Sequence, residues 1–188
     1  FVPWLFLTAG VHTLMIFKAT KHSLKATFLL FIFAFAFVLY STFLTRSGIL
    51  GDSSVHSFTD LGMTGQLLVF LGIFLLPAFT LLAFYWSRIP DNREDETTSS
   101  REFWIFLGVL FLVVSAIQIT YSTSIPVWNK LFDLKLAPPI NANEHYNNIQ
   151  IWFAIIVTAL MAFTPFMNYK NTDFKKLFKE LGLISVIS

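Results

Sequence analysis

The sequence predicts an all-α, polytopic membrane protein with a bundle of about five transmembrane helices. Hydrophobic residues make up 55% of the 188 residues and charged residues only 13%, and the mean hydropathy is +0.67. These values lie outside the range of ordinary soluble domains. Four stretches without Asp, Glu, Lys or Arg are each long enough for the roughly 20 apolar residues that cross a bilayer as a helix. They are residues 26–45, 61–87, 103–129 and 146–169.

The helices are expected in chain order at the following positions. The first is FVPWLFLTAGVHTLMIF, whose apolar run has no basic segment before it, unlike a signal peptide. The others fall within the four uncharged stretches, and all five tryptophans lie near predicted ends, as membrane-interface residues do. The C-terminal LGLISVIS reads like the start of a further span. We therefore interpret residues 1–188 as an internal part of one transmembrane domain, with spans at about 1–17, 26–45, 64–86, 103–122 and 149–167, and a further one beginning at 181–188.

The positions of Lys and Arg predict which loops share a side of the membrane. Ten lie in loops on one side and three in loops on the other, and short cytoplasmic loops tend to be basic. The ten are Lys18, Lys21, Lys25, Arg88, Arg93, Arg101, Lys170, Lys175, Lys176 and Lys179; the three are Arg46, Lys130 and Lys135. We expect residues 46–60 and 123–146 on the outer side, where KLFDLKL (130–136) could form a short helix on the lipid surface. The net charge of +2 is spread over several loops, so the expected surroundings are membrane lipid and not nucleic acid.

Several kinds of chemistry find no support in the sequence. The chain has no cysteine, so it forms neither disulfides nor thiolate metal sites, and any thiol must come from a partner. Neither a Ser-His-Asp arrangement nor an HExxH motif is present, which argues against hydrolysis. We assign no catalytic residue.

His12 is a candidate ligand within the membrane. It lies about 16 Å below the start of the first span, near the bilayer centre. Ionisable groups are costly there, and both ring nitrogens need partners. A metal ion or haem iron would satisfy one of them. A hydrogen bond to a neighbouring helix is an equally good interpretation.

The polar stretch TRSGILGDSSVHSF, residues 45–58, contains a second candidate ligand, His56. Much of an unperturbed imidazole is neutral at pH 7, as coordination requires, although a solvated loop histidine is the ordinary alternative. Arg46 could clamp a carboxylate or simply anchor its helix at the lipid interface. His22 and His145 are interpreted as structural, although His145 could approach the site of His56.

Three segments carry a resemblance to a known family. PWLFLTAGVHTL (3–14), YSTFLTRSGIL (40–50) and SVHSF (54–58) resemble, in order and spacing, the CcmF-type cytochrome c haem lyases of the haem-handling, WWD-containing family. The match is strong from Pro3 to Phe58 and fades afterwards. It implies that His12 is an axial ligand of a haem b and that His56 is one of two outer ligands of the substrate haem. The WWD segment, the other outer histidine and the second haem b ligand have no counterpart here.

The resemblance also implies a reaction and its partners. The complete protein would receive haem from a membrane-anchored haem chaperone, work with thiol-handling maturation proteins, and join haem vinyl groups to the CxxCH cysteines of apocytochrome c. The expected location is the bacterial inner membrane, with residues 46–60 and 123–146 in the periplasm, and the chain alone is expected to be inactive. Two alternatives stay open: a transporter or channel segment with His12 in a proton or substrate path, and a b-type cytochrome anchor, which would have paired intramembrane histidines.

Overall fold

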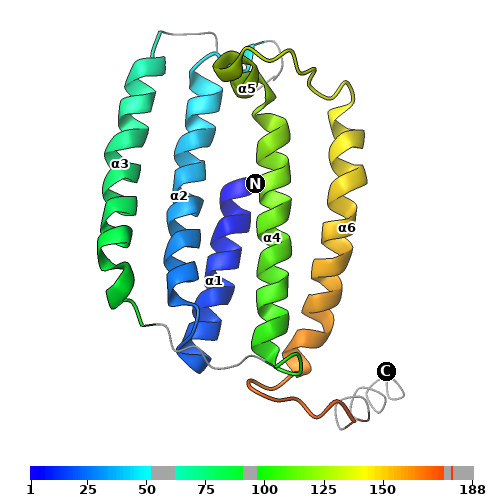
Figure 1. Ribbon diagram of the computed structural model, residues 1–188. Helices are drawn as coiled ribbons and strands as arrows, with labels where there is room; N and C mark the ends of the chain where they lie inside the picture. The colour runs from blue at the N-terminus through cyan, green and yellow to red at the C-terminus, as the bar shows by residue number, and fades with distance from the viewer. Residues whose placement is uncertain (52–61, 91–96, 176–178, 180–188) are drawn as a thin grey trace.

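Five long helices lie side by side in the computed structural model, which describes residues 1–51, 62–90, 97–175 and 179 (Figure 1). They are α1 (Val2–Thr20), α2 (Leu24–Arg46), α3 (Thr64–Tyr85), α4 (Arg101–Thr123) and α6 (Ala142–Phe163). Each of them is long and apolar enough to cross a membrane. All regular secondary structure in these residues is helical, so the predicted fold class is confirmed and the chain is an integral membrane protein. The further span predicted at 181–188 lies outside the described residues.

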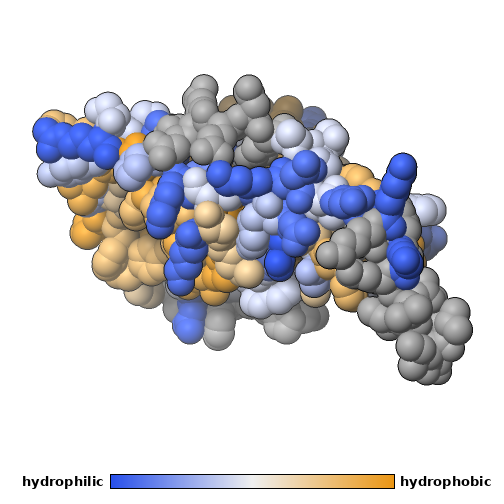
Figure 2. Space-filling view, turned by 90° about the horizontal axis from the view of Figure 1, so that it is seen from below, coloured by the Kyte–Doolittle hydropathy of each residue, from blue (hydrophilic) through white to orange (hydrophobic). Residues whose placement is uncertain are grey.

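The helices alternate in direction, which brings the predicted basic loops to one end. The turn between α1 and α2, the end of α3, the start of α4 and the end of α6 all lie at the bottom of Figure 1. We call this the basic end, because it carries Lys18, Arg88 and Arg101. Viewed from that side, hydrophilic side chains run across the molecule between hydrophobic flanks (Figure 2). The end of α2 and the start of α3 lie at the other end, which we call the opposite end.

The helices form a row and not a closed ring. Contacts between neighbours run in the order α3, α2, α1, α4, α6, which is the order seen in Figure 1. Helix α4 therefore has α1 on one side and α6 on the other. Helix α3 buries none of its residues, so it packs only at its edge against α2.

Small residues allow α1 and α2 to approach each other closely. Ala9 and Thr13 are fully buried, and a Cβ added to Gly10 would lie 2.6 Å from the ring of Phe31. Thr27 of α2 donates a hydrogen bond to the Thr13 hydroxyl at 2.9 Å. Close backbone approach through small residues is the usual way that membrane helices pack, because hydrophobic burial does not drive them together in lipid. It fixes α1 in the row and so fixes the position of His12.

A short helix, α5 (Ile125–Phe132), follows α4 at the opposite end. The sequence predicted a short helix over 130–136, five residues later. The helix begins earlier because Pro126 sits in its first turn, where the fixed φ of proline and its missing N–H cost nothing. It ends at Asp133, whose φ of 52° is left-handed, so Leu134, Lys135 and Leu136 lie outside it.

Candidate functional site

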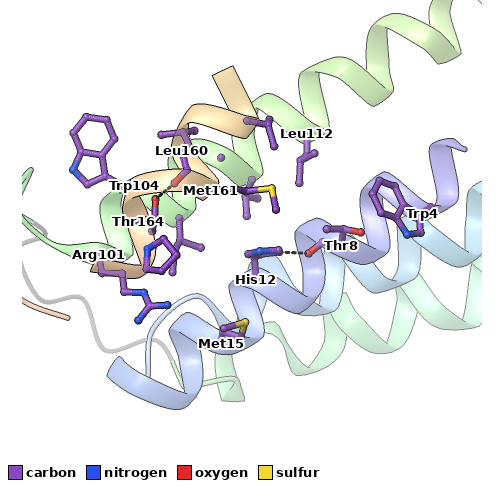
Figure 3. Close-up of a pocket in the computed structure, with 15 residues that line it drawn as sticks. Trp4, Thr8, His12, Met15, Arg101, Trp104, Leu112, Leu160, Met161 and Thr164 are labelled. Atoms are coloured by element: carbon purple, nitrogen blue, oxygen red, sulfur yellow. Dashed lines mark hydrogen bonds between the residues drawn. The ribbon is translucent and has the colours of Figure 1, made fainter. Parts of the chain in front are cut away.

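A cavity of about 350 Å³ lies between α1 and α6, on the half of α4 nearest the basic end (Figure 3). Three helical faces line it. Helix α1 contributes Trp4, Thr8, His12 and Met15; α4 contributes Arg101, Trp104, Ile105, Gly108, Val109 and Leu112; α6 with the short 3-10 helix η3 (Thr164–Phe166) contributes Val157, Leu160, Met161, Thr164 and Pro165. Each set repeats every three or four residues, which places it on one face of its helix. The walls are mostly apolar and aromatic, as in pockets for small molecules and cofactors.

The local sequence explains why there is space against α4. Helix α4 starts at the N-cap Ser100, whose side chain accepts a hydrogen bond from the Phe103 amide, the usual way to satisfy the first turn. Two turns later Gly108 contributes no side chain to the cavity floor. A Cβ placed there would already be in van der Waals contact with Leu160, at 3.6 Å. Any larger side chain at residue 108 would therefore occupy the cavity.

His12 is half-buried and presents one ring nitrogen for binding. Its Nδ1 lies 2.8 Å from the Thr8 carbonyl oxygen, one turn earlier in α1 (Figure 3). A carbonyl oxygen only accepts, so Nδ1 carries the hydrogen and donates it. The neutral ring then keeps its free electron pair on Nε2, which has no hydrogen-bond partner among the residues that the structure describes. This is the arrangement of metal-binding histidines, whose other nitrogen is fixed by a carbonyl or carboxylate.

The same geometry bears on the second interpretation of His12. A structural histidine was expected to bond a neighbouring helix, whereas this imidazole bonds the backbone of its own helix. Such a bond does nothing to hold α1 against α4 or α2. It orients the ring instead, and a binding role is the interpretation that it favours.

Arg101 is the cationic group of this cavity, and the sequence interpretation treated it only as a loop charge. Its Nε is buried and is the one such side-chain atom without a hydrogen-bond partner in the described part of the chain. The guanidinium carbon lies 5.0 Å from the centre of the Tyr169 ring, a cation–π contact that holds the group in place. The sequence could have indicated Arg101, because residues 101, 104 and 108 are three and four positions apart and so lie on one face of the helix that begins this uncharged span.

A small network of backbone hydrogen bonds holds the basic end of the cavity together. The Arg101 amide donates to the Asn168 carbonyl at 3.0 Å, and the Thr172 amide donates to the Ser99 carbonyl at 2.9 Å. The Glu102 side chain is buried and accepts from the Lys170 amide through both carboxylate oxygens, at 3.0 and 3.2 Å. These bonds tie the start of α4 to the segment after α6.

The other predicted site residues lie elsewhere. His56 falls within residues 52–61, outside the described residues. Arg46 is exposed and is the last residue of α2, about 33 Å from the start of that helix, whereas His12 lies only about 12 Å from the end of α1 at the same turn. The structure therefore does not bring Arg46 and His12 together.

A separate group of polar side chains joins α4 and α6 nearer the opposite end. Ser115 donates to Gln150 at 2.5 Å, and Gln150 donates to Gln118 at 2.6 Å. Gln118 in turn donates to Ser122 at 3.3 Å, and the Ser122 hydroxyl lies 3.2 Å from Nε2 of His145. We call these five residues the polar chain.

The polar chain bears on the transport alternative left open by the sequence. A transport path through His12 should show other polar groups facing it, but Gln118 and Gln150 bond each other, and Gln66 is exposed on α3. A b-type anchor would pair two histidines within the membrane; among the described residues His22 bonds Ser23 in the turn after α1 and His145 bonds Ser122, so neither pairs with His12 in this part of the protein. Within the described ranges, no three His, Cys, Asp or Glu residues gather as a tetrahedral zinc site would require.

Comparison with known proteins shows several relatives. The chain is 28% identical to the cytochrome c-type biogenesis protein CcmF of Escherichia coli over 189 residues, which is 100% of this chain. It is 31% identical to the cytochrome c-type biogenesis protein ccl1 of Rhodobacter capsulatus over 96% of this chain, and 35% identical to CcmF of Haemophilus influenzae over 71%. The alignments cover 28%, 27% and 20% of these relatives, so the chain spans about a quarter of their length. No family profile and no solved structure matches the chain.

Proposed function

Because this chain is a CcmF-type sequence, similar over nearly its whole length to cytochrome c biogenesis proteins, we propose that it is part of a haem lyase of cytochrome c maturation. The resemblance first drawn from residues 3–58 is confirmed by relatives that align far beyond Phe58. In this proposal the complete protein binds haem in the membrane and helps to attach a second haem covalently to apocytochrome c.

The chemistry of the residues that line the His12 cavity supports a haem b site. Its donor is the His12 imidazole with Nε2 unpartnered among the described residues, its walls are mostly apolar, and one wall carries Arg101, whose Nε has no hydrogen-bond partner there. His12 would hold the iron through Nε2, and a further ligand would come from another part of the complete protein. A bound haem b supplies a one-electron redox centre within the membrane. The Thr8 carbonyl keeps the His12 ring in the required tautomer, and the apolar walls exclude water from it.

His56 would bind the haem that is being attached. This part of the proposal is supported by the SVHSF segment and the relatives, since His56 lies outside the described residues. Arg46 would bind a carboxylate near it. Attachment adds each cysteine S–H of the CxxCH motif across a vinyl C=C of the haem, which forms one C–S and one C–H bond and releases nothing. The chain itself supplies no thiol, so the apocytochrome must bring both.

The proposed partners and location follow from this reaction. A haem chaperone would deliver the substrate, and thiol-handling proteins would keep the apocytochrome cysteines reduced. The membrane would be the bacterial inner membrane, with residues 46–60 and 123–146 in the periplasm. The uneven distribution of Lys and Arg supports this orientation.

The single observation that carries the proposal is the free Nε2 of His12, fixed toward an apolar cavity by the bond to Thr8. The test uses the complete protein, purified in detergent. We expect a b-type absorbance spectrum that His12→Ala abolishes or weakens. We expect His56→Ala to retain that spectrum and to block cytochrome c maturation in cells.

His22→Ala is the matched control, because His22 lies in the turn after α1 and outside the cavity. It should change neither the spectrum nor maturation. Normal haem content and normal maturation in both the His12 and the His56 variants would reject the proposal.

A further inference from the structure

Arg101 places a positive charge beside an apolar cavity, and it has no anionic partner in the described part of the chain. The guanidinium lines the same cavity as His12. Its Nε is buried without a hydrogen-bond partner. Arginine stays protonated under all ordinary conditions, so this charge cannot be removed by losing a proton.

The nearest carboxylate along the chain is already committed elsewhere. Glu102 accepts two hydrogen bonds from the Lys170 amide and is 5% exposed. The Tyr169 ring contacts one face of the guanidinium. The face of a ring provides no hydrogen-bond acceptor for the N–H groups, which point outward in the guanidinium plane. Arg101 therefore lines the cavity with no carboxylate partner among the described residues.

The depths of the two polar groups indicate the shape of the ligand. Arg101 is the first residue of α4 at the basic end, and His12 lies about 12 Å from the same end of α1. Between and beyond them the walls are Trp4, Val109 and Leu112. A ligand that fits has an apolar body beside His12 and an anionic group directed toward the basic end.

We propose that Arg101 binds the propionate carboxylates of the tetrapyrrole that His12 binds, so that the propionates point toward the basic end of the bundle. The inference rests on the haem b proposal above and adds the orientation of the ligand. Arginine and carboxylate form paired, charge-assisted hydrogen bonds, which is the chemistry that the unsatisfied Nε requires. A lipid phosphate at the membrane surface offers a similar anion, and the experiment separates the two.

The experiment compares two ligands that differ only in charge. The complete protein is prepared without haem and titrated with haem or with haem dimethyl ester, whose propionates are neutral, and binding is followed by the Soret absorbance. We expect the unaltered protein to bind haem about ten- to a hundredfold more tightly than the ester, as a charge-assisted hydrogen bond would give. Arg101→Gln should lose this preference by weakening haem binding and leaving ester binding unchanged.

Arg88→Gln is the matched control. Arg88 also lies at the basic end and also stacks on an aromatic ring, with its guanidinium carbon 5.2 Å from the Tyr85 ring, but it does not line the cavity. It should keep the full preference for haem. Arg101→Lys should keep part of it, since lysine retains the charge but not the paired geometry.

Four outcomes would overturn the inference. Equal binding of haem and its ester by the unaltered protein would do so even if Arg101→Gln failed to fold. If a folded Arg101→Gln variant still bound haem more tightly than the ester, that result would also overturn the inference. A haem spectrum that depends on His12 in the same experiment would leave the haem b proposal standing. Loss of co-purified anionic phospholipid from Arg101→Gln, with haem affinity unchanged, would assign Arg101 to a lipid phosphate. Absence of any His12-dependent haem would overturn both proposals together.

Discussion

Helices α4 and α6 form two very different regions along a single contact. Near the opposite end, the five residues of the polar chain bond to one another in sequence from Ser115 to His145. Near the basic end, the same two helices and α1 line a cavity in which His12 and Arg101 have polar atoms without partners among the described residues. Polar groups that satisfy each other hold helices together. Polar groups left over beside a cavity indicate a ligand.

The energies support this distinction. Hydrogen bonds between membrane helices contribute about 0.6 kcal/mol on average and at most about 1.7, so the polar chain stabilises the packing of α6 on α4 by a few kcal/mol at most. A buried polar group without a partner costs about 1–3 kcal/mol. The chain therefore loses stability at the cavity, and a bound ligand would restore it.

The largest effect is expected from filling the cavity. Gly108→Leu places a side chain in the floor beside Leu160, where the ligand would lie. We expect haem bound per protein to fall at least about tenfold, because a well-packed site accommodates extra atoms poorly, while the helical content stays the same. The measurement is the pyridine haemochrome assay on the purified complete protein, with circular dichroism for helicity.

Gly72→Leu is the matched control for that change. Gly72 lies on α3, where an added Cβ would meet only Leu76 at 3.9 Å, and it does not line the cavity. It should keep full haem content. Equal haem in both leucine variants would show that the cavity is not where haem binds.

A smaller effect is expected at the centre of the polar chain. Gln150→Leu removes its bonds to Ser115 and Gln118 and should lower the free energy of unfolding by about 1–2 kcal/mol. Haem content should stay nearly normal, because Gln150 does not line the cavity. Unfolding in SDS, followed by circular dichroism, measures the first effect. Gln66→Leu, on an exposed face of α3, is the control, and a loss of stability as large in that variant would contradict a special role for Gln150.

The smallest effect is expected at the end of the polar chain. His145→Ala removes one bond, to Ser122 at 3.2 Å, and should cost about 0.6 kcal/mol. A double-mutant cycle with Ser122→Ala in the same SDS unfolding experiment would isolate this bond. If His145→Ala instead abolished cytochrome c maturation without loss of stability, His145 would belong to the functional site and not to the polar chain.

The fold could be predicted from the sequence because uninterrupted apolar length is enough to identify a membrane helix. His12 could be singled out for a related reason, since an imidazole at membrane depth is rare and costly. The role of His56 stays a prediction, because that residue lies outside the described ranges.

Arg101 and the polar chain could not be predicted in the same way. Arg101 has no carboxylate partner because the neighbouring Glu102 instead accepts a hydrogen bond from the Lys170 amide, 68 positions away. The pairing of Gln118 with Gln150 depends on which faces of α4 and α6 meet. Helices that are apolar on all sides give no pattern from which to read those faces. Both features come from tertiary contacts that local sequence does not encode.

The bond between Thr8 and His12 connects two positions one turn apart in the same helix. It forms together with α1 and needs no contact from α4 or α6. The orientation of the imidazole is therefore set within α1 alone, whatever the arrangement of the other helices that line the cavity. A change in how α4 or α6 packs would alter the walls of the cavity without turning this ring.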